Sequence, residues 1–201
     1  IFIVLPDKFT IAFIILPKYN IEKYFFMRGD VDMKIIQLHN STISQMMGYL
    51  LITDQGKVIA VDGGTEGDAP EFKRLVRENG GHIDLWFLTH PHHDHHDVFV
   101  NFSEHPEPDI TVGLVCYSPA PEDLTVRDQD QSINDVIQLR KAIKITPYPV
   151  HVLEVGESFE TGNVKIDILR VVNKNIKEDF VNNPVSYTHL RAHETDQNLV
   201  C

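Results

Sequence analysis

Five of the eleven histidines in this 201-residue chain lie within seven consecutive positions, from His90 to His96. The stretch before them, from Ile83 to Leu88, is short, apolar and rich in β-prone residues, so it predicts a buried strand. The histidines therefore leave the end of a rigid strand and enter a loop. Loops held by a rigid scaffold are where proteins usually carry their chemistry.

The order within this cluster is H-x-H-x-D-H, filled by His90, His92, Asp94 and His95. Imidazole nitrogens and carboxylate oxygens together suit zinc, and also iron or manganese. Residues two apart on an extended segment share a face, so His90 and His92 are placed to hold one ion. Asp94 and His95 follow the bend and are placed for a second ion, about 3.5–4 Å away in two-metal hydrolytic sites. A solvated His-rich tract that binds metal incidentally is the alternative.

The segment from Thr89 to His95 resembles the signature loop of the metallo-β-lactamase superfamily position by position. Upstream, residues 48–52 and 61–64 look like the opening hairpin and the D-G turn of that family. One departure is the pair His96 and Asp97, where the family usually has small residues, often glycines. The resemblance implies an α/β fold, with this chain as the N-terminal part of a truncated αββα sandwich.

The same resemblance implies that the parent protein is a zinc-dependent hydrolase, with two ions in the intact protein. His90 and His92 would hold one ion and Asp94 and His95 the other. Asp94 would also be the catalytic residue that orients an attacking hydroxide. Further ligands, a bridging aspartate and a late histidine, would come from the second half of the sandwich.

Asp62 stands before the glycines of the 61–64 segment. As a residue pattern alone it is equally a turn former, whereas the resemblance implies a carboxylate that supports the metal loop from behind. Such partners fix the tautomer and orientation of a ligating histidine. The surrounding pattern predicts strands over 33–38, 46–52 and 57–61, and a helix that starts at a capping box beginning at Asp68 and ends at Asn79.

Two more helices are predicted after the motif. Val98, Phe99 and Phe102 predict a short amphipathic helix. Residues 132–144 predict another, with Ile133, Val136, Ile137 and Ile143 on its inner face.

Composition excludes few classes of protein. A net charge of −11 argues against a broad basic surface for nucleic acid. The two cysteines, Cys116 and Cys201, are far apart and in no metal-ligand spacing, which favours a reducing compartment and a cytoplasmic location. Cys116 lies in an apolar run and is predicted to be a buried thiol. The longest uncharged run near the start, 9–17, is much shorter than the ~20 residues that cross a bilayer, so no membrane partner is expected.

Three segments are expected along the chain. Residues 1–32 are interpreted as a non-native or disordered extension, and 33–184 as a partial metallo-β-lactamase-like domain. Residues 185–201 resemble translated sequencing-adapter read-through, so His189 and His193 are not expected to be ligands. The order of elements that ends at 182–184 resembles the competence-type DNA-uptake branch of the superfamily.

The sequence is compatible with three classes of function to different degrees. The first is a fragment of a zinc-dependent hydrolase acting on a small molecule or on a nucleic-acid phosphodiester. The second, an oxygen- or nitric-oxide-reducing di-iron protein, is disfavoured because such relatives carry a glutamate where this chain has His92. The third is a non-catalytic metal-binding or scaffold domain. The isolated chain is expected to be inactive, with one sheet face uncovered, and no oligomeric state is predicted.

Overall fold

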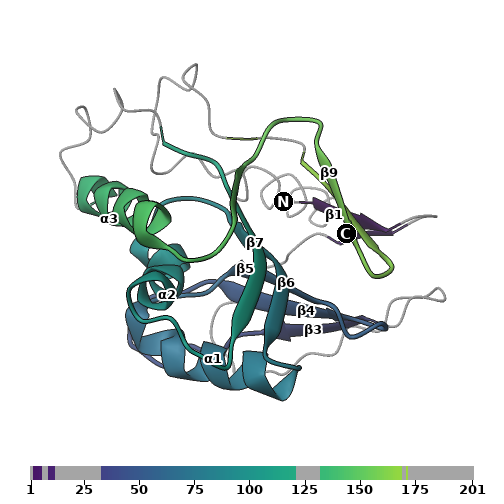
Figure 1. The fold of residues 1–201 in the computed structure, drawn as a ribbon, viewed down its shortest axis with the longest axis horizontal. Coiled ribbons are helices and arrows are strands. Elements are labelled where there is room, and N and C mark those ends of the chain that lie inside the picture. Colours follow the sequence, from purple (N-terminus) through teal and green to yellow (C-terminus); the bar gives the residue numbers. More distant parts are fainter. Residues whose placement is uncertain (1, 6–8, 12–32, 121–131, 169–170, 172–201) are drawn as a thin grey trace, which may run out of the picture.

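The computed structural model describes residues 2–5, 9–11, 33–120, 132–168 and 171. Its largest element is a six-stranded sheet in the order β3-β4-β5-β6-β7-β8 (Figure 1). The strands are β3 (Met33–Gln37), β4 (Gly48–Thr53), β5 (Val58–Asp62), β6 (His82–Leu88), β7 (Thr111–Tyr117) and β8 (Val150–Val152). The expected α/β class is confirmed, as are the strands predicted before Asp62 and before His90.

Strand direction changes once across this sheet. β3, β4 and β5 pair antiparallel, whereas β5, β6, β7 and β8 pair parallel. The carboxyl ends of β5 and β6 therefore lie side by side at one edge, and these ends are Asp62 and Leu88. Ligand sites of α/β sheets usually form at this edge.

Three α-helices of the described residues cover one face of this sheet (Figure 1). They are α1 (Ala69–Glu78), α2 (His93–Glu104) and α3 (Ser132–Ile145), and a short 3₁₀ turn, η1 (Glu66–Asp68), precedes α1. Their buried faces join the sheet in one core cluster, to which Phe72, Phe99 and Leu139 contribute. None of the helices in the described ranges is long and apolar enough to cross a membrane.

A second, four-stranded sheet in the order β2-β1-β10-β9 lies on the opposite face (Figure 1). Its strands are β1 (Phe2–Leu5), β2 (Phe9–Ile11), β9 (Ser158–Thr161) and β10 (Val164–Asp167). Val164 and Ile166 are buried in one cluster with Leu51 and Phe87 of the large sheet. The expectation that one face of the large sheet is uncovered is therefore wrong around Leu51 and Phe87, because apolar side chains of β10 pack on them.

Two local expectations are corrected. The capping box lies one turn earlier than predicted, at Thr65 and Asp68 of η1, while Asp68 makes no side-chain cap to α1. The cause is that the Asp68 carboxylate is already bound to Thr65, through its N–H at 2.9 Å and its hydroxyl at 2.7 Å. On α3, Val136 is buried as predicted, but Ile137, also predicted on the inner face, is 54% exposed, and Leu139 is buried.

The proposed segment boundaries stay predictions. Within 1–32, the described residues 2–5 and 9–11 form β1 and β2, and β1 pairs antiparallel with β10. The tail 185–201, with His189 and His193, lies outside the described residues, as does Cys201. Cys116 is fully buried as predicted, and burial raises the pKa of its thiol to about 12.

Trp86 lies at the centre of the helix-covered core and is fully buried. Its ring stacks on Phe72 with centroids 5.0 Å apart and meets Phe99 and Phe102 edge to face. Its indole N–H donates to the backbone carbonyl of Asp62 at 2.9 Å. The side chain therefore joins the helices, β6 and the end of β5.

Trp86→Ala is expected to lower the free energy of unfolding by about 3–5 kcal/mol, because it opens a cavity among three other rings. Urea denaturation followed by far-UV circular dichroism measures this loss. Ile43→Ala is the control, since Ile43 is fully exposed and its truncation should change stability by less than about 0.5 kcal/mol. A similar loss in both variants would contradict the central position of Trp86.

Candidate metal centre

The histidine motif occupies the connection between β6 and α2. β6 ends at Leu88 and α2 begins at His93, so the helix starts inside the motif, several residues before the predicted helical stripe at Val98. The first two candidate ligands thus lie on an extended connection and the last two in the first helical turn. His92 is the N-cap residue, with an extended backbone (φ −94°, ψ 143°).

His90 and His92 form the first donor pair. His90 Nε2 and His92 Nδ1 are 3.1 Å apart, and the ring centroids are 4.8 Å apart. Two nitrogens that bind one tetrahedral zinc at 2.0–2.1 Å lie about 3.3 Å apart. The 3.1 Å between His90 Nε2 and His92 Nδ1 is close to this separation. The spacing of His90 and His92 predicts that their side chains share a face, and the structure brings them together.

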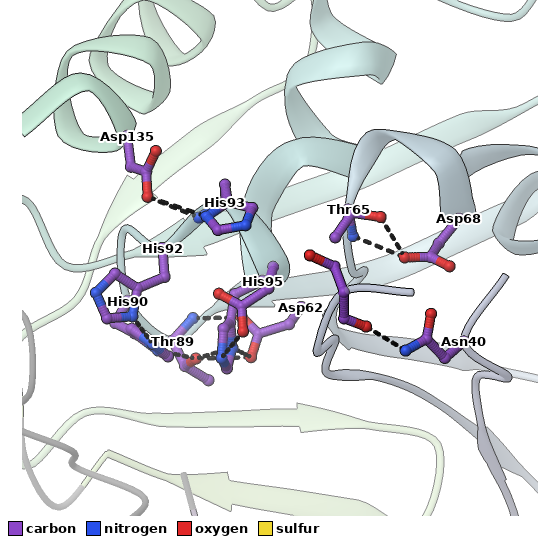
Figure 2. Close-up of polar contacts among 12 residues, drawn as sticks. Asn40, Asp62, Thr65, Asp68, Thr89, His90, His92, His93, His95 and Asp135 are labelled. Carbon is purple, nitrogen blue, oxygen red and sulfur yellow. Dashed lines mark hydrogen bonds and ion pairs between the residues drawn. The ribbon is translucent and has the colours of Figure 1, made fainter. Parts of the chain in front are cut away.

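Asp94 and His95 form the second donor pair. His95 Nε2 lies 3.8 Å from Asp94 Oδ2. The His95 ring also lies against His90, with centroids 3.7 Å apart, so the two pairs are adjacent. Figure 2 shows His90, His92 and His95 gathered on one side of α2 with Thr89 and Asp62 beside them.

Asp62 holds this cluster from behind. Its side chain is completely buried, and its carboxylate accepts three hydrogen bonds. The donors are Thr89 N at 2.8 Å, Thr89 Oγ1 at 2.6 Å and His95 Nδ1 at 2.7 Å (Figure 2). Because the carboxylate takes the proton-bearing Nδ1 of His95, Nε2 is the nitrogen left for a metal.

Thr89 connects Asp62 to His90 and so fixes the tautomer of His90 as well. Its hydroxyl hydrogen is donated to Asp62, so its oxygen accepts from His90 Nδ1, 3.0 Å away. His90 thereby carries its hydrogen on Nδ1 and presents the lone pair of Nε2. One buried carboxylate thus fixes the tautomers of two candidate ligands, His95 directly and His90 through Thr89.

A tight glycine turn lets α2 approach this carboxylate. Asp62 has φ 54° and Gly64 has φ +97°, both left-handed, which glycine adopts without strain. A Cβ on Gly63 would lie 2.8 Å from Val98 Cβ. The backbone also joins the two segments, since Gly64 N donates to His95 O and Val98 N donates to Gly64 O. A larger residue at Gly63 would push the first turn of α2 away from Asp62.

The pKa values of His90 and His92 are both lowered, which favours the neutral imidazoles. Burial, with the charges of the neighbouring histidines, lowers the pKa of His90 well below its ordinary value. Burial also lowers the pKa of His92, although Asp94 acts in the opposite direction. Metal ligation needs unprotonated imidazole, so both rings are ready to bind near neutral pH.

His95 behaves differently. Burial lowers its pKa, but the charge of Asp62 and its hydrogen bond outweigh burial, so the pKa is raised above 6.5. A cation at Nε2 must therefore compete with a proton on His95 more than on His90.

The donors form two pairs instead of one complete cage. Among the residues that the structure describes, no three His, Cys, Asp or Glu side chains are arranged to hold a metal ion together. The nitrogen spacing of the first pair and the free Nε2 beside Asp94 nevertheless fit a cation such as zinc, whose protein ligands are imidazole nitrogen and carboxylate oxygen.

Two contributors were missed from the sequence. Thr89 belongs to the motif, but the spacing of the motif does not indicate that the Thr89 hydroxyl connects Asp62 to His90. Asp135 lies on α3, and its Oδ2 is 3.1 Å from His93 N. Nothing near Asp135 in the sequence indicates this contact, because it depends on how two helices pack.

A family described as the Metallo-beta-lactamase superfamily matches residues 49–96, a range that contains Asp62 and all four candidate ligands. No curated protein matches the chain. Among solved structures, one relative is a HARLDQ-motif mutant of a metallo-beta-lactamase from Cronobacter sakazakii, with 20% identity and a TM-score of 0.42. It is matched over 65% of this chain and 48% of its own.

Two further structures are similar to this chain. MEM-A1, a subclass B3 metallo-beta-lactamase from a soil metagenome library, is 16% identical with a TM-score of 0.41, over 64% of this chain and 46% of its own. A diphosphatase from the PhnP family is 20% identical with a TM-score of 0.35, over 57% of this chain and 40% of its own. The chain therefore spans less than half of the length of these structures.

Asp62→Asn is expected to lower the pKa of His95, because the charge that raises it is removed while burial remains. A side-chain NMR titration of His95 measures the change. Asp84→Asn is the control: Asp84 bonds Lys57 in the same sheet, 3.0 Å away, and should leave the pKa of His95 unchanged. A His95 pKa that is the same in Asp62→Asn as in the wild type would contradict the proposed cause.

The same pair predicts how stability depends on pH. The folded-state pKa of His95 lies above its unfolded value, so protonated His95 stabilises the fold below the ordinary pKa. This contribution is lost as the pH rises through the folded-state pKa. The lowered pKa values of His90 and His92 act in the opposite direction, so the loss is measured as a difference between two proteins. Urea denaturation between pH 5 and pH 9 should show the stability advantage of the wild type over Asp62→Asn shrinking as the pH rises.

Proposed function

We propose that this chain is part of a metal-dependent hydrolase of the metallo-β-lactamase superfamily, with two zinc ions in the intact protein. The observation that carries the proposal is the action of Asp62, which engages Nδ1 of His95 directly and Nδ1 of His90 through Thr89. Nε2 of each ring thereby faces another candidate ligand, His92 Nδ1 at 3.1 Å from His90 and Asp94 Oδ2 at 3.8 Å from His95. The family match over 49–96 supports the same class.

Within this proposal, His90 and His92 would hold one cation, and Asp94 and His95 the other. Bound there, a divalent cation would supply Lewis acidity and would ionise water near neutral pH. The Asp94 carboxylate would accept a hydrogen bond from the attacking water and so orient it toward the substrate. Asp62 would not touch the substrate, because it is buried behind Thr89 and His95.

Zinc is the proposed metal because the donors are imidazole nitrogens with one carboxylate. Iron and manganese accept the same donors, so the proposal extends to them. His92 disfavours the di-iron redox class, which was expected to carry a glutamate at this position.

The proposed substrates are molecules with a hydrolysable ester, amide, thioester or phosphodiester. A nucleic-acid phosphodiester is included because the order of elements resembles the competence-type branch, although the net charge of −11 requires a local binding groove. The alternative is a non-catalytic metal-binding or scaffold domain. Such a domain would bind metal at the same residues but would hydrolyse no substrate.

His92→Ala is expected to remove about one zinc ion per chain, because it breaks the first donor pair. Zinc is measured by elemental analysis after equilibration at pH 7.5 and removal of free metal. His105→Ala is the matched control, since His105 is exposed after the end of α2. Equal zinc content in the wild type and His92→Ala would remove His92 from the ligands, and a zinc-free wild type would contradict the proposal.

An assay of hydrolysis distinguishes the hydrolase from the non-catalytic scaffold domain. Zinc-loaded chain is tested on p-nitrophenyl esters and on bis(p-nitrophenyl) phosphate, with Asp94→Asn beside it. Turnover in the wild type that falls at least tenfold in Asp94→Asn supports the hydrolase. Stoichiometric zinc without turnover, in this chain and in a longer reading frame, supports the scaffold.

A further inference from the structure

Two histidines of the motif, His93 and His96, are not among the proposed ligands. Both contact the same residue, Asp135 of α3. His93 Nδ1 lies 3.3 Å from Asp135 Oδ2, and His96 Nε2 lies 3.1 Å from the backbone oxygen of Asp135. Figure 2 shows His93 pointing away from His90, His92 and His95 and toward Asp135.

Asp135 also accepts a hydrogen bond from the His93 backbone N–H, at the start of α2. The first N–H groups of a helix have no partner within the helix, and a side chain at the N-cap usually satisfies one of them. Here the N-cap is His92, whose side chain makes no such bond. The Asp135 carboxylate accepts the His93 N–H instead, at 3.1 Å, so α2 is capped from another helix. His92 thereby stays free to face His90.

The second contact fixes the far side of the same turn. His96 is completely buried, and a carbonyl oxygen only accepts, so Nε2 of His96 donates to Asp135. His93 and His96 are three positions apart and lie on one face of the helix, toward α3. Asp94 and His95 lie between these two anchors, and His95 is directed toward Asp62.

We propose that Asp135 is a positioning residue for the metal loop, holding the first turn of α2 so that Asp94 and His95 face the first donor pair. This inference rests on the proposed metal-binding function. Loss of a group bonded directly to a metal ligand typically weakens metal binding 10–100-fold. Asp135 bonds His93 and His96 instead, so it acts on Asp94 and His95 through the backbone of α2. A contact that only packs α3 against α2 would change stability but not the coordination of the metal.

Co(II) binding to the full chain is the test, because it reports affinity and ligand geometry without any turnover. Asp135→Ala should weaken Co(II) binding about tenfold or more and should change the visible absorption of the bound ion. Asp135→Asn keeps an oxygen that accepts the His93 N–H, so it should restore the wild-type absorption and bind within about threefold of the wild type. Asn134→Ala, an exposed neighbour on α3, is the control.

The outcomes separate this inference from the proposed function. Wild-type affinity and absorption in Asp135→Ala would overturn the role of Asp135 and leave the metal site in place. A wild type that binds no Co(II) would remove both. If Asp135→Ala fails to fold by far-UV circular dichroism, Asp135→Gln moves the acceptor by one methylene within a residue that favours helix. Weakened Co(II) binding in Asp135→Gln supports the proposal, and unchanged binding overturns it.

Discussion

A buried carboxylate needs partners, and in this fold the partners of Asp62 are the metal loop itself. A charge taken out of water is tolerated only where hydrogen bonds replace its hydration. Asp62 obtains them from the backbone and hydroxyl of Thr89 and from the ring of His95. The end of β5, the end of β6 and the first turn of α2 are thereby joined at one point. The orientation of the histidines follows from this requirement.

Sheet topology makes that junction possible. β5 and β6 are parallel neighbours, so their carboxyl ends reach the same edge although α1 separates them in the chain. The turn after Asp62 consists of glycines, and Gly63 leaves no room for a Cβ beside Val98. Trp86 adds a bond from the core to the Asp62 carbonyl. The aromatic core and the candidate site are therefore parts of one packing arrangement.

Much of this arrangement was predictable because its signals are local. The apolar run before His90 gave a strand, the H-x-H-x-D-H order gave two donor pairs, and the position of Asp62 before a glycine turn suggested a supporting carboxylate. The start of α2 was placed too late, because His93 to Asp97 have no apolar stripe and the helix is held there by contacts to other elements.

The remaining features depend on contacts distant in sequence. Asp135 is about forty positions after His93, and only the packing of α3 on α2 brings them together. The cover over the second sheet face was missed for the same reason, because the alternation of β10 predicts a strand but not that it packs on Leu51 and Phe87 of the large sheet. Spacing places both Val136 and Ile137 on the inner face of α3, whereas the actual rotation of the helix buries Val136 with Leu139 and leaves Ile137 exposed.

The central claim is that the end of a stiff strand presents specific imidazole nitrogens to divalent cations. Long-range ¹H–¹⁵N spectra of the histidine side chains during zinc titration of the full chain test it directly. We expect zinc to shift Nε2 of His90, Nδ1 of His92 and Nε2 of His95, while Nε2 of His96 stays protonated. Unchanged nitrogens at His90, His92 and His95, with shifts at exposed histidines such as His105, would contradict it.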